Sequence, residues 1–122
     1  MSGKTGKSEE ACRELVRVLE EAIHVGADSV GLEHDHGDLL VYYYCGNMGL
    51  GAPRIPEDME TEVLDELARR AGLARRVKGK MQLTLLGKEY EVLVKSYQDF
   101  DEWCYRLTLK ERKTKPGGGI IQ

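Results

Sequence analysis

The sequence predicts an α+β domain in which two helices pack on a mainly antiparallel sheet of about five strands. Two amphipathic helix patterns are separated by a strand-rich stretch, and the last third of the chain alternates like a three-stranded meander. The chain has 122 residues, which suits one domain with one core. We expect this domain to span residues 9–112, between flexible tails at 1–8 and 113–122.

The first helix is expected over residues 9–25. Its apolar positions recur at helical spacing and form one stripe: Leu15, Val18, Leu19 and Ala22. Ser8 can cap the N-terminus with its hydroxyl, and Gly26 is placed to end the helix because glycine accepts the left-handed conformation.

A β-hairpin is expected next, with a turn at D-H-G-D (residues 35–38). Its first strand surrounds Val30 and Leu32, and its second covers residues 39–45. Because strand side chains alternate, the second strand should place two sets on opposite faces. One set is Leu39, Val41 and Tyr43, and the other is Leu40, Tyr42 and Tyr44. Residues 46–56 are rich in Gly and Pro and predict a loop.

The second helix is expected over residues 56–71, with Pro56 in its first turn and Gly72 as its stop. Acidic residues at its start and arginines at its end complement the helix dipole. Its apolar stripe comprises Met59, Val63, Leu64, Leu67 and Ala71. The meander strands are expected at residues 80–86, 89–97 and 103–112.

Composition narrows the possible functions. The formal net charge is −3 and the pI is about 5.7, which argues against nucleic acid as the main partner. No apolar run approaches the roughly 18 residues that a membrane span needs, and the N-terminus carries no secretory signal pattern. Cys12, Cys45 and Cys104 form no CxxC pair, so we expect reduced thiols and a cytoplasmic location.

The order of motifs resembles the N-terminal, PAS-like domain of the type II secretion and type IV pilus assembly ATPases. The family pattern A-S-D-I-H-I-E corresponds to A-D-S-V-G-L-E at residues 27–33, and R-Y-R-I-D-G corresponds to Y-Y-Y-C-G-N at 42–47. D-G-R-F corresponds to V-K-G-K-M at 77–81. R-V-S and L-R-L-L correspond to L-V-K-S at 93–96 and Y-R-L-T at 105–108. Each motif is short, so their order and spacing carry the resemblance.

The resemblance covers roughly residues 15–109, and the departures from it are informative. In the family, arginines on these strands reach a nucleotide held by a neighbouring motor domain. Here Tyr42 and Tyr44 replace two of them, Leu93 replaces a third, and only Arg106 keeps a counterpart. A leucine cannot stabilise phosphate charge, and a tyrosine offers only a neutral donor. The resemblance therefore implies a fold and the ability to dock against another protein domain, and it does not imply catalysis.

Several short motifs have catalytic or ligand-binding residue types. Gly3-Lys4-Thr5 and Gly6-Lys7-Ser8 echo the end of a phosphate-binding loop, but the required preceding glycine and strand are missing, which favours a tail. His34 and His36 alternate in an extended segment and could ligate a metal, although an exposed turn is the alternative. The cysteines favour buried or inert thiols over catalysis. The acidic second helix favours a solvated face over an acid–base pair: Glu57, Asp58, Glu60, Glu62, Asp65 and Glu66.

Two features suggest a docking surface. A basic cluster around the end of the second helix could meet an acidic partner, or could complement the helix dipole and aid solubility: Arg69, Arg70, Arg75, Arg76, Lys78 and Lys80. Three adjacent tyrosines cannot all point inward, so Tyr42 and Tyr44 should lie on the face opposite Tyr43. That face could form a protein interface, or it could be covered by the second helix or a neighbouring strand.

From these features we expect a non-catalytic protein-interaction module without a cofactor. The expected binding residues are Tyr42, Tyr44, Arg106, Arg75 and Arg76. The partner would be a protein, such as a secretion or pilus component or a second copy of the chain. The alternative is a PAS-like domain that senses a small ligand or a nucleotide. An enzyme is not expected, because neither a phosphate loop nor a catalytic triad is visible.

Overall fold

The computed structural model describes residues 3–99 and 101–112, with side chains from Ser8 onward. Within these residues it contains two α-helices, a short 3-10 turn and a six-stranded sheet. The helices are α1 (Gly3–His24) and α2 (Glu60–Ala71), and the 3-10 turn is η1 (Glu57–Met59). The strands are β1 (Ser29–Asp35), β2 (Asp38–Cys45), β3 (Met48–Gly51), β4 (Lys78–Leu85), β5 (Lys88–Asp99) and β6 (Glu102–Glu111).

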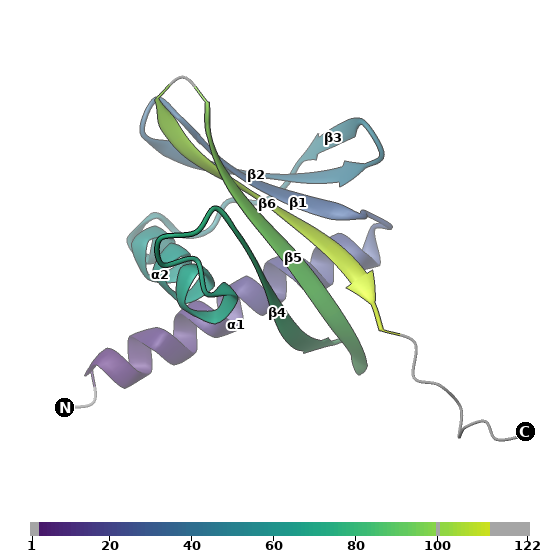
Figure 1. Cartoon of the computed structure of the whole chain (residues 1–122), viewed down its shortest axis with the longest axis horizontal. Coiled ribbons are helices and arrows are strands. Elements are labelled where there is room, and N and C mark those ends of the chain that lie inside the picture. Colours follow the sequence, from purple (N-terminus) through teal and green to yellow (C-terminus); the bar gives the residue numbers. More distant parts are fainter. Residues whose placement is uncertain (1–2, 100, 113–122) are drawn as a thin grey trace, which may run out of the picture.

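The sheet is antiparallel throughout, with strand order β3-β2-β1-β6-β5-β4. Both helices lie on the same side of it (Figure 1). The predicted α+β class is therefore confirmed, and the strand count exceeds the expected five by one. No described helix covers the opposite side, which we call the outer face.

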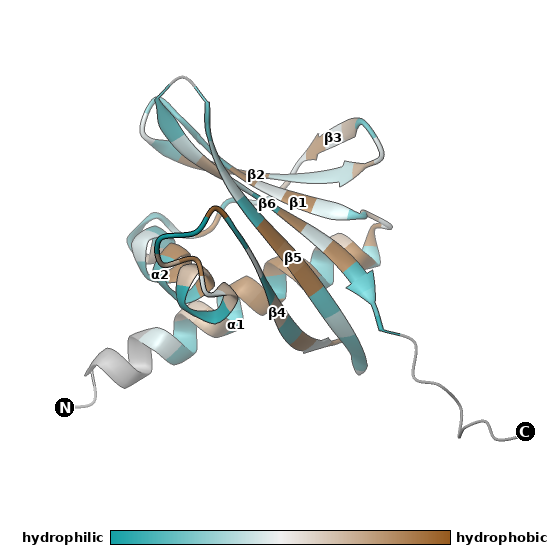
Figure 2. Ribbon diagram, in the orientation of Figure 1, coloured by the Kyte–Doolittle hydropathy of each residue, from teal (hydrophilic) through white to brown (hydrophobic). Residues whose placement is uncertain are grey.

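The core lies between the helices and the sheet. Apolar side chains from every layer are almost fully buried there, including Leu15 and Leu19 of α1 and Leu67 of α2. They meet inward-facing residues of the strands, such as Leu32 and Leu107. Hydrophobic residues are found in the middle of β5 and in the middle of α1 (Figure 2). At about 25 cal/mol for each Å² of apolar surface buried, this contact is the main stabilising term of the fold.

Both α-helices end as the sequence predicts. At the end of α1, Gly26 has φ +84° and its N–H bonds to Ile23, while the N–H of Ala27 bonds to Ala22. Gly72 has φ +67° and closes α2 with the same pair of backbone bonds. This is the Schellman arrangement, in which a left-handed residue satisfies the last carbonyl groups.

The start of α1 differs from the prediction. The helix begins at Gly3 instead of residue 9, so Ser8 lies inside it and is not an N-cap. The Ser8 hydroxyl instead donates a 3.0 Å hydrogen bond to Glu66 of α2. This long-range partner cannot be read from local sequence. Residues 1–2 and 113–122, assigned to tails in the sequence, lie outside the described residues.

β3 is also a correction, because residues 46–56 were expected to form a loop. Gly46 (φ +62°) and Asn47 make a two-residue turn, and Met48–Gly51 returns along β2. All four residues of β3 are exposed, so no alternation of buried side chains marks the strand. Backbone pairing at the sheet edge stabilises it instead. The other strand bounds agree with the prediction to within two residues in the meander.

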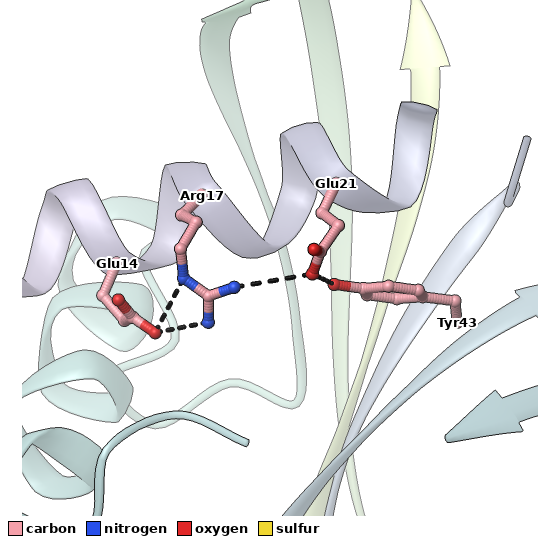
Figure 3. Close-up of polar contacts among 4 residues, drawn as sticks. All are labelled: Glu14, Arg17, Glu21 and Tyr43. Carbon is pink, nitrogen blue, oxygen red and sulfur yellow. Dashed lines mark hydrogen bonds and ion pairs between the residues drawn. The ribbon is translucent and has the colours of Figure 1, made fainter. Parts of the chain in front are cut away.

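Polar contacts link α1 to the sheet. Tyr43 points into the helix side of β2, with 4% of its surface exposed, and its hydroxyl donates to Glu21. Arg17 bridges Glu21 and Glu14 along the helix (Figure 3). Burial, followed by the hydrogen bond to Glu21, raises the pKa of Tyr43 well above its usual value. The phenol therefore stays protonated and continues to donate.

Glu66 corrects the expectation of a solvated acidic face on the second helix. Its side chain is only 4% exposed, and it accepts hydrogen bonds from Arg69 and Arg70 as well as from Ser8. Burial alone would raise the pKa of this carboxyl, but the three donors outweigh burial and hold the pKa below its usual value. Glu66 thus stays ionised and ties α1 to α2.

Candidate functional site

Tyr42, Tyr44 and Arg106 lie together on the outer face. In the register of the sheet, Gly31 of β1 stands between Tyr42 of β2 and Arg106 of β6. Tyr44 is two residues further along β2, and its ring centroid is 6.3 Å from that of Tyr42. Tyr43 is buried on the helix side, so the predicted split of the three tyrosines is confirmed. Neither helix covers Tyr42 or Tyr44.

The Tyr44 ring is held from several sides. A Cβ atom added to Gly31 or to Gly49 would come within 2.8 Å of the ring, so the absence of side chains there makes room for it. The Tyr44 hydroxyl donates a 2.6 Å hydrogen bond to Glu33. The guanidinium carbon of Arg106 lies 4.0 Å from the ring centroid, in cation–π geometry. We call Glu33, Tyr42, Tyr44 and Arg106 the tyrosine–arginine cluster.

The electrostatics of this cluster favour donation by Tyr44. Burial, followed by the hydrogen bond to Glu33, raises the pKa of Tyr44 to about 12. Burial also raises the pKa of the neighbouring Tyr97, with Glu33 adding to the effect. Both phenols are therefore neutral at physiological pH, and Arg106 is the cation of the cluster.

Arg106 belongs to a row of cations that crosses three strands. Lys78 of β4 stands directly opposite Lys95 of β5, which in turn stands opposite Arg106 of β6. We call these three residues the basic row. None of them forms an ion pair within the described part of the chain, whereas Lys80 pairs with Glu91 nearby. The Nε atom of Arg106 is buried and has no hydrogen-bond partner among the described residues.

The β1–β2 turn lies at the same end of the sheet as the end of β5 and the start of β6 (Figure 1). An acidic groove at this end adjoins the cluster. Its volume is about 570 Å³, and Leu40 and Tyr42 line it alongside its acidic residues. The carboxylates are those of Glu33, Asp35, Asp99 and Glu102. Glu102 accepts bonds from the backbone N–H groups of His36 and Gly37, which joins the β1–β2 turn to the start of β6.

Arg75 and Arg76, the other predicted docking residues, lie in a different place. They line a groove of about 370 Å³ beside the end of α2, together with Trp103, Tyr105 and Val77. Tyr105 is on the helix side of β6, so this groove is separate from the tyrosine–arginine cluster. The five predicted binding residues therefore divide between two surfaces.

The structure also locates the weaker candidates. Gly3–Ser8 is helical, so its two Gly-Lys pairs do not form a loop that could wrap a phosphate. His34 Nδ1 lies 2.5 Å from the carbonyl oxygen of Trp103, and His36 Nδ1 lies 2.8 Å from Asp35. Among residues 3–99 and 101–112, no group of three or more metal-ligating side chains could hold an ion.

The three cysteines are free, with Cys104 buried, Cys45 exposed and Cys12 between these extremes. Burial raises the pKa of the Cys104 thiol, which makes it a poor nucleophile. In the part of the chain that the structure describes, no helix has the length and apolar character to cross a membrane.

The sequence did not reveal three residues of these surfaces: Glu33, Lys95 and Trp103. Glu33 and Lys95 become informative only once the strand register places them beside Tyr44 and Arg106. Trp103 is 48% exposed although tryptophan is usually much more buried. It is the second residue of β6 and lines the groove beside the end of α2, a position that depends on how the helix sits on the sheet.

A scan of protein-family models and a search of the curated proteins found no match to this chain. Its function is therefore inferred from its own residues and their geometry.

Proposed function

We propose that this chain is a non-catalytic protein-interaction module that binds a protein partner through the outer face. It would be a divergent, cytoplasmic relative of the N-terminal, PAS-like domain of secretion and pilus assembly ATPases, and its partner a component of such a machine. The observation that carries the proposal is the tyrosine–arginine cluster, which stands prearranged on a face that no described helix covers.

The chemistry of the cluster suits a protein interface. Tyr and Arg are the residue types most enriched among those that dominate binding energy, together with Trp. Tyr44 and Arg106 hold each other in place before any partner arrives, which reduces the entropy lost on binding. Tyr42 is half-buried beside them and offers ring surface and a hydroxyl. An isologous dimer centred here would bring the cations of two copies together, so a different protein is the better occupant.

The order of elements supports the proposed relationship. Helix, strands, helix and a closing meander follow one another in the order on which the resemblance rests. Tyr42, Tyr44 and Leu93, which stand at family arginine positions, all belong to the outer face. The surface that carries arginines in the family would thus keep a docking role, although most of the arginines that reach a nucleotide are replaced.

Sensing of a small ligand between sheet and helices is the competing function. Leu19, Leu32 and Leu67 have no exposed surface, so side chains fill the space such a ligand would need. A thermal-shift screen with nucleotides and divalent metals separates the two functions. We expect no shift in melting temperature, and a saturable shift of several degrees would favour a ligand-sensing domain.

The test of this proposal begins by identifying a partner. Proteins retained by the immobilised chain are named by mass spectrometry, and the leading one is purified for affinity measurements. We expect Tyr42→Ala/Tyr44→Ala to weaken binding at least about tenfold, because both side chains would lie in the contact. The control is Arg13→Ala/Val25→Ala, which removes two exposed side chains from α1 and the turn after it. Equal affinity of both variants, or self-association of the wild type that the tyrosine variant abolishes, would refute a separate partner at this face.

A further inference from the structure

We infer that the basic row recognises a carboxylate-rich segment of the protein partner. This inference rests on the proposed docking role of the outer face and names the chemistry that the face selects. Lys78, Lys95 and Arg106 are direct cross-strand neighbours on three adjacent strands. Like charges placed directly opposite each other destabilise a sheet, so the row costs stability in the isolated chain.

Two other cations of the same sheet have acidic partners. Lys80 lies 3.3 Å from Glu91, and Lys88 lies 3.8 Å from Glu111. No described carboxylate lies within ion-pair distance of the basic row. Glu33 is the acid of the adjoining cluster, but it accepts from the Tyr44 hydroxyl instead of pairing with Arg106. The positive charge of the row is therefore left for an outside anion.

The surroundings of Arg106 independently support an anionic ligand. Its Nε–H donor is buried without a hydrogen-bond partner among the described residues, and a buried donor left unpaired is costly. The Tyr44 ring beneath the guanidinium carbon restrains the Arg106 side chain, so less freedom is lost when its terminal nitrogens donate to a carboxylate. Strands lie about 4.8 Å apart, so the row spans roughly 10 Å. Two acidic side chains on the same face of a partner segment, at positions i and i+2 of a strand or i and i+4 of a helix, can reach across that width.

A protein segment fits the face better than a nucleic acid. The acidic groove of Glu33, Asp35, Asp99 and Glu102 adjoins the cluster and would repel a phosphate backbone that continued past the row. The net charge of −3 likewise argues against nucleic acid as the main partner. A short acidic stretch followed by neutral or basic residues would avoid that repulsion.

The test uses a fluorescent peptide of three glutamates followed by five serines, with an oligothymidylate of four nucleotides, which carries three phosphodiester charges, as the competing anion. Binding to the full chain is measured by anisotropy at low salt. We expect Lys78→Gln/Lys95→Gln to weaken peptide binding about tenfold, since each exposed ion pair contributes modestly. The control Arg13→Gln/Lys88→Gln also removes two exposed cations and should stay within about twofold of wild type.

Two results would overturn the inference: equal peptide affinity for the two double variants, including no binding at all, or tighter binding of the oligothymidylate than of the peptide. The second result would assign the row to nucleic acid. The outcome is separable from that of the docking proposal. If Tyr42→Ala/Tyr44→Ala loses the purified partner while Lys78→Gln/Lys95→Gln keeps it, the docking face stands and the acidic segment does not.

Discussion

Tyr44 is the side chain around which the outer face is organised. Its ring needs the bare backbone of Gly31 and Gly49, its hydroxyl needs Glu33, and its face carries Arg106. Each neighbour comes from a different point in the sequence, and strand register alone brings them together. A small change beside the ring should therefore disturb the whole cluster.

Gly31→Ala tests this dependence. The new Cβ would lie 2.8 Å from both the Tyr44 ring and the Glu33 carboxylate, so the cluster must shift. We expect the free energy of unfolding to fall by about 1–3 kcal/mol, as in other overpacked sites. Urea denaturation measures the change, with Gly51→Ala as the control, because a Cβ there meets nothing within 4 Å. Equal stability of the two variants would show that the Tyr44 ring is not confined by Gly31.

Glu66 gives a prediction with a pH signature. Glu66→Gln should lower the free energy of unfolding by about 1–2 kcal/mol at pH 7, because the donors around it lose their anion. The folded pKa of Glu66 lies below the ordinary value of 4.5, so its contribution to stability is present above that pH. The contribution is lost as the pH falls through the folded pKa. Denaturation curves from pH 7 to pH 3 should therefore converge for wild type and variant.

Asp65→Asn is the matched control for Glu66→Gln, since Asp65 is an exposed acid on the same helix. We expect its effect to stay within about 0.5 kcal/mol at every pH. A stability difference for Glu66→Gln that persists unchanged at pH 3 would mean that the ionised carboxyl is not what joins α1 to α2.

The spacing of elements is set by small residues as much as by large ones. Gly79 of β4 lies so close to the end of α2 that an added Cβ would stand 1.9 Å from the backbone oxygen of Ala71. A backbone atom cannot swing aside as a side chain can. This contact fixes the distance between the strand and the helix that covers it.

Gly79→Ala should therefore be among the most damaging single substitutions in the chain. We expect a loss of about 3 kcal/mol or more in the free energy of unfolding, or failure to fold, because β4 must move away from α2. Thermal unfolding followed by circular dichroism measures it against Gly51→Ala. A melting temperature within about 2 °C of that control would contradict the close approach.

The sequence predicts the buried elements of this fold better than the exposed ones. Hydrophobic periodicity predicted α2, the meander and the inward orientation of Tyr43, because buried positions carry apolar residues at a regular spacing. β3 left no such pattern, because its side chains are exposed and its stability comes from backbone pairing. The burial of Glu66 was missed for a related reason, because its partner Ser8 is 58 positions away in the sequence.

In the whole molecule, the two faces of the sheet differ in composition and in what covers them. One face is covered by α1 and α2 (Figure 1) and holds the core. The other face carries the tyrosine–arginine cluster and the basic row. The sequence predicted that Tyr42, Tyr44 and Arg106 would serve docking, and the register brings these three together. It grouped Arg75 and Arg76 with them, although these line a separate groove. Charge alone cannot tell which surface a loop residue joins.

Site-specific photo-crosslinking tests the central claim, that the outer face docks a protein, most directly. A benzophenone amino acid is placed at Tyr42 in one sample and at Arg13 of α1 in the other, and crosslinked proteins are identified by mass spectrometry. We predict that position 42 captures one defined partner through an acidic segment and that position 13 does not. Capture of the same proteins at both positions, or of none at position 42, would contradict the account.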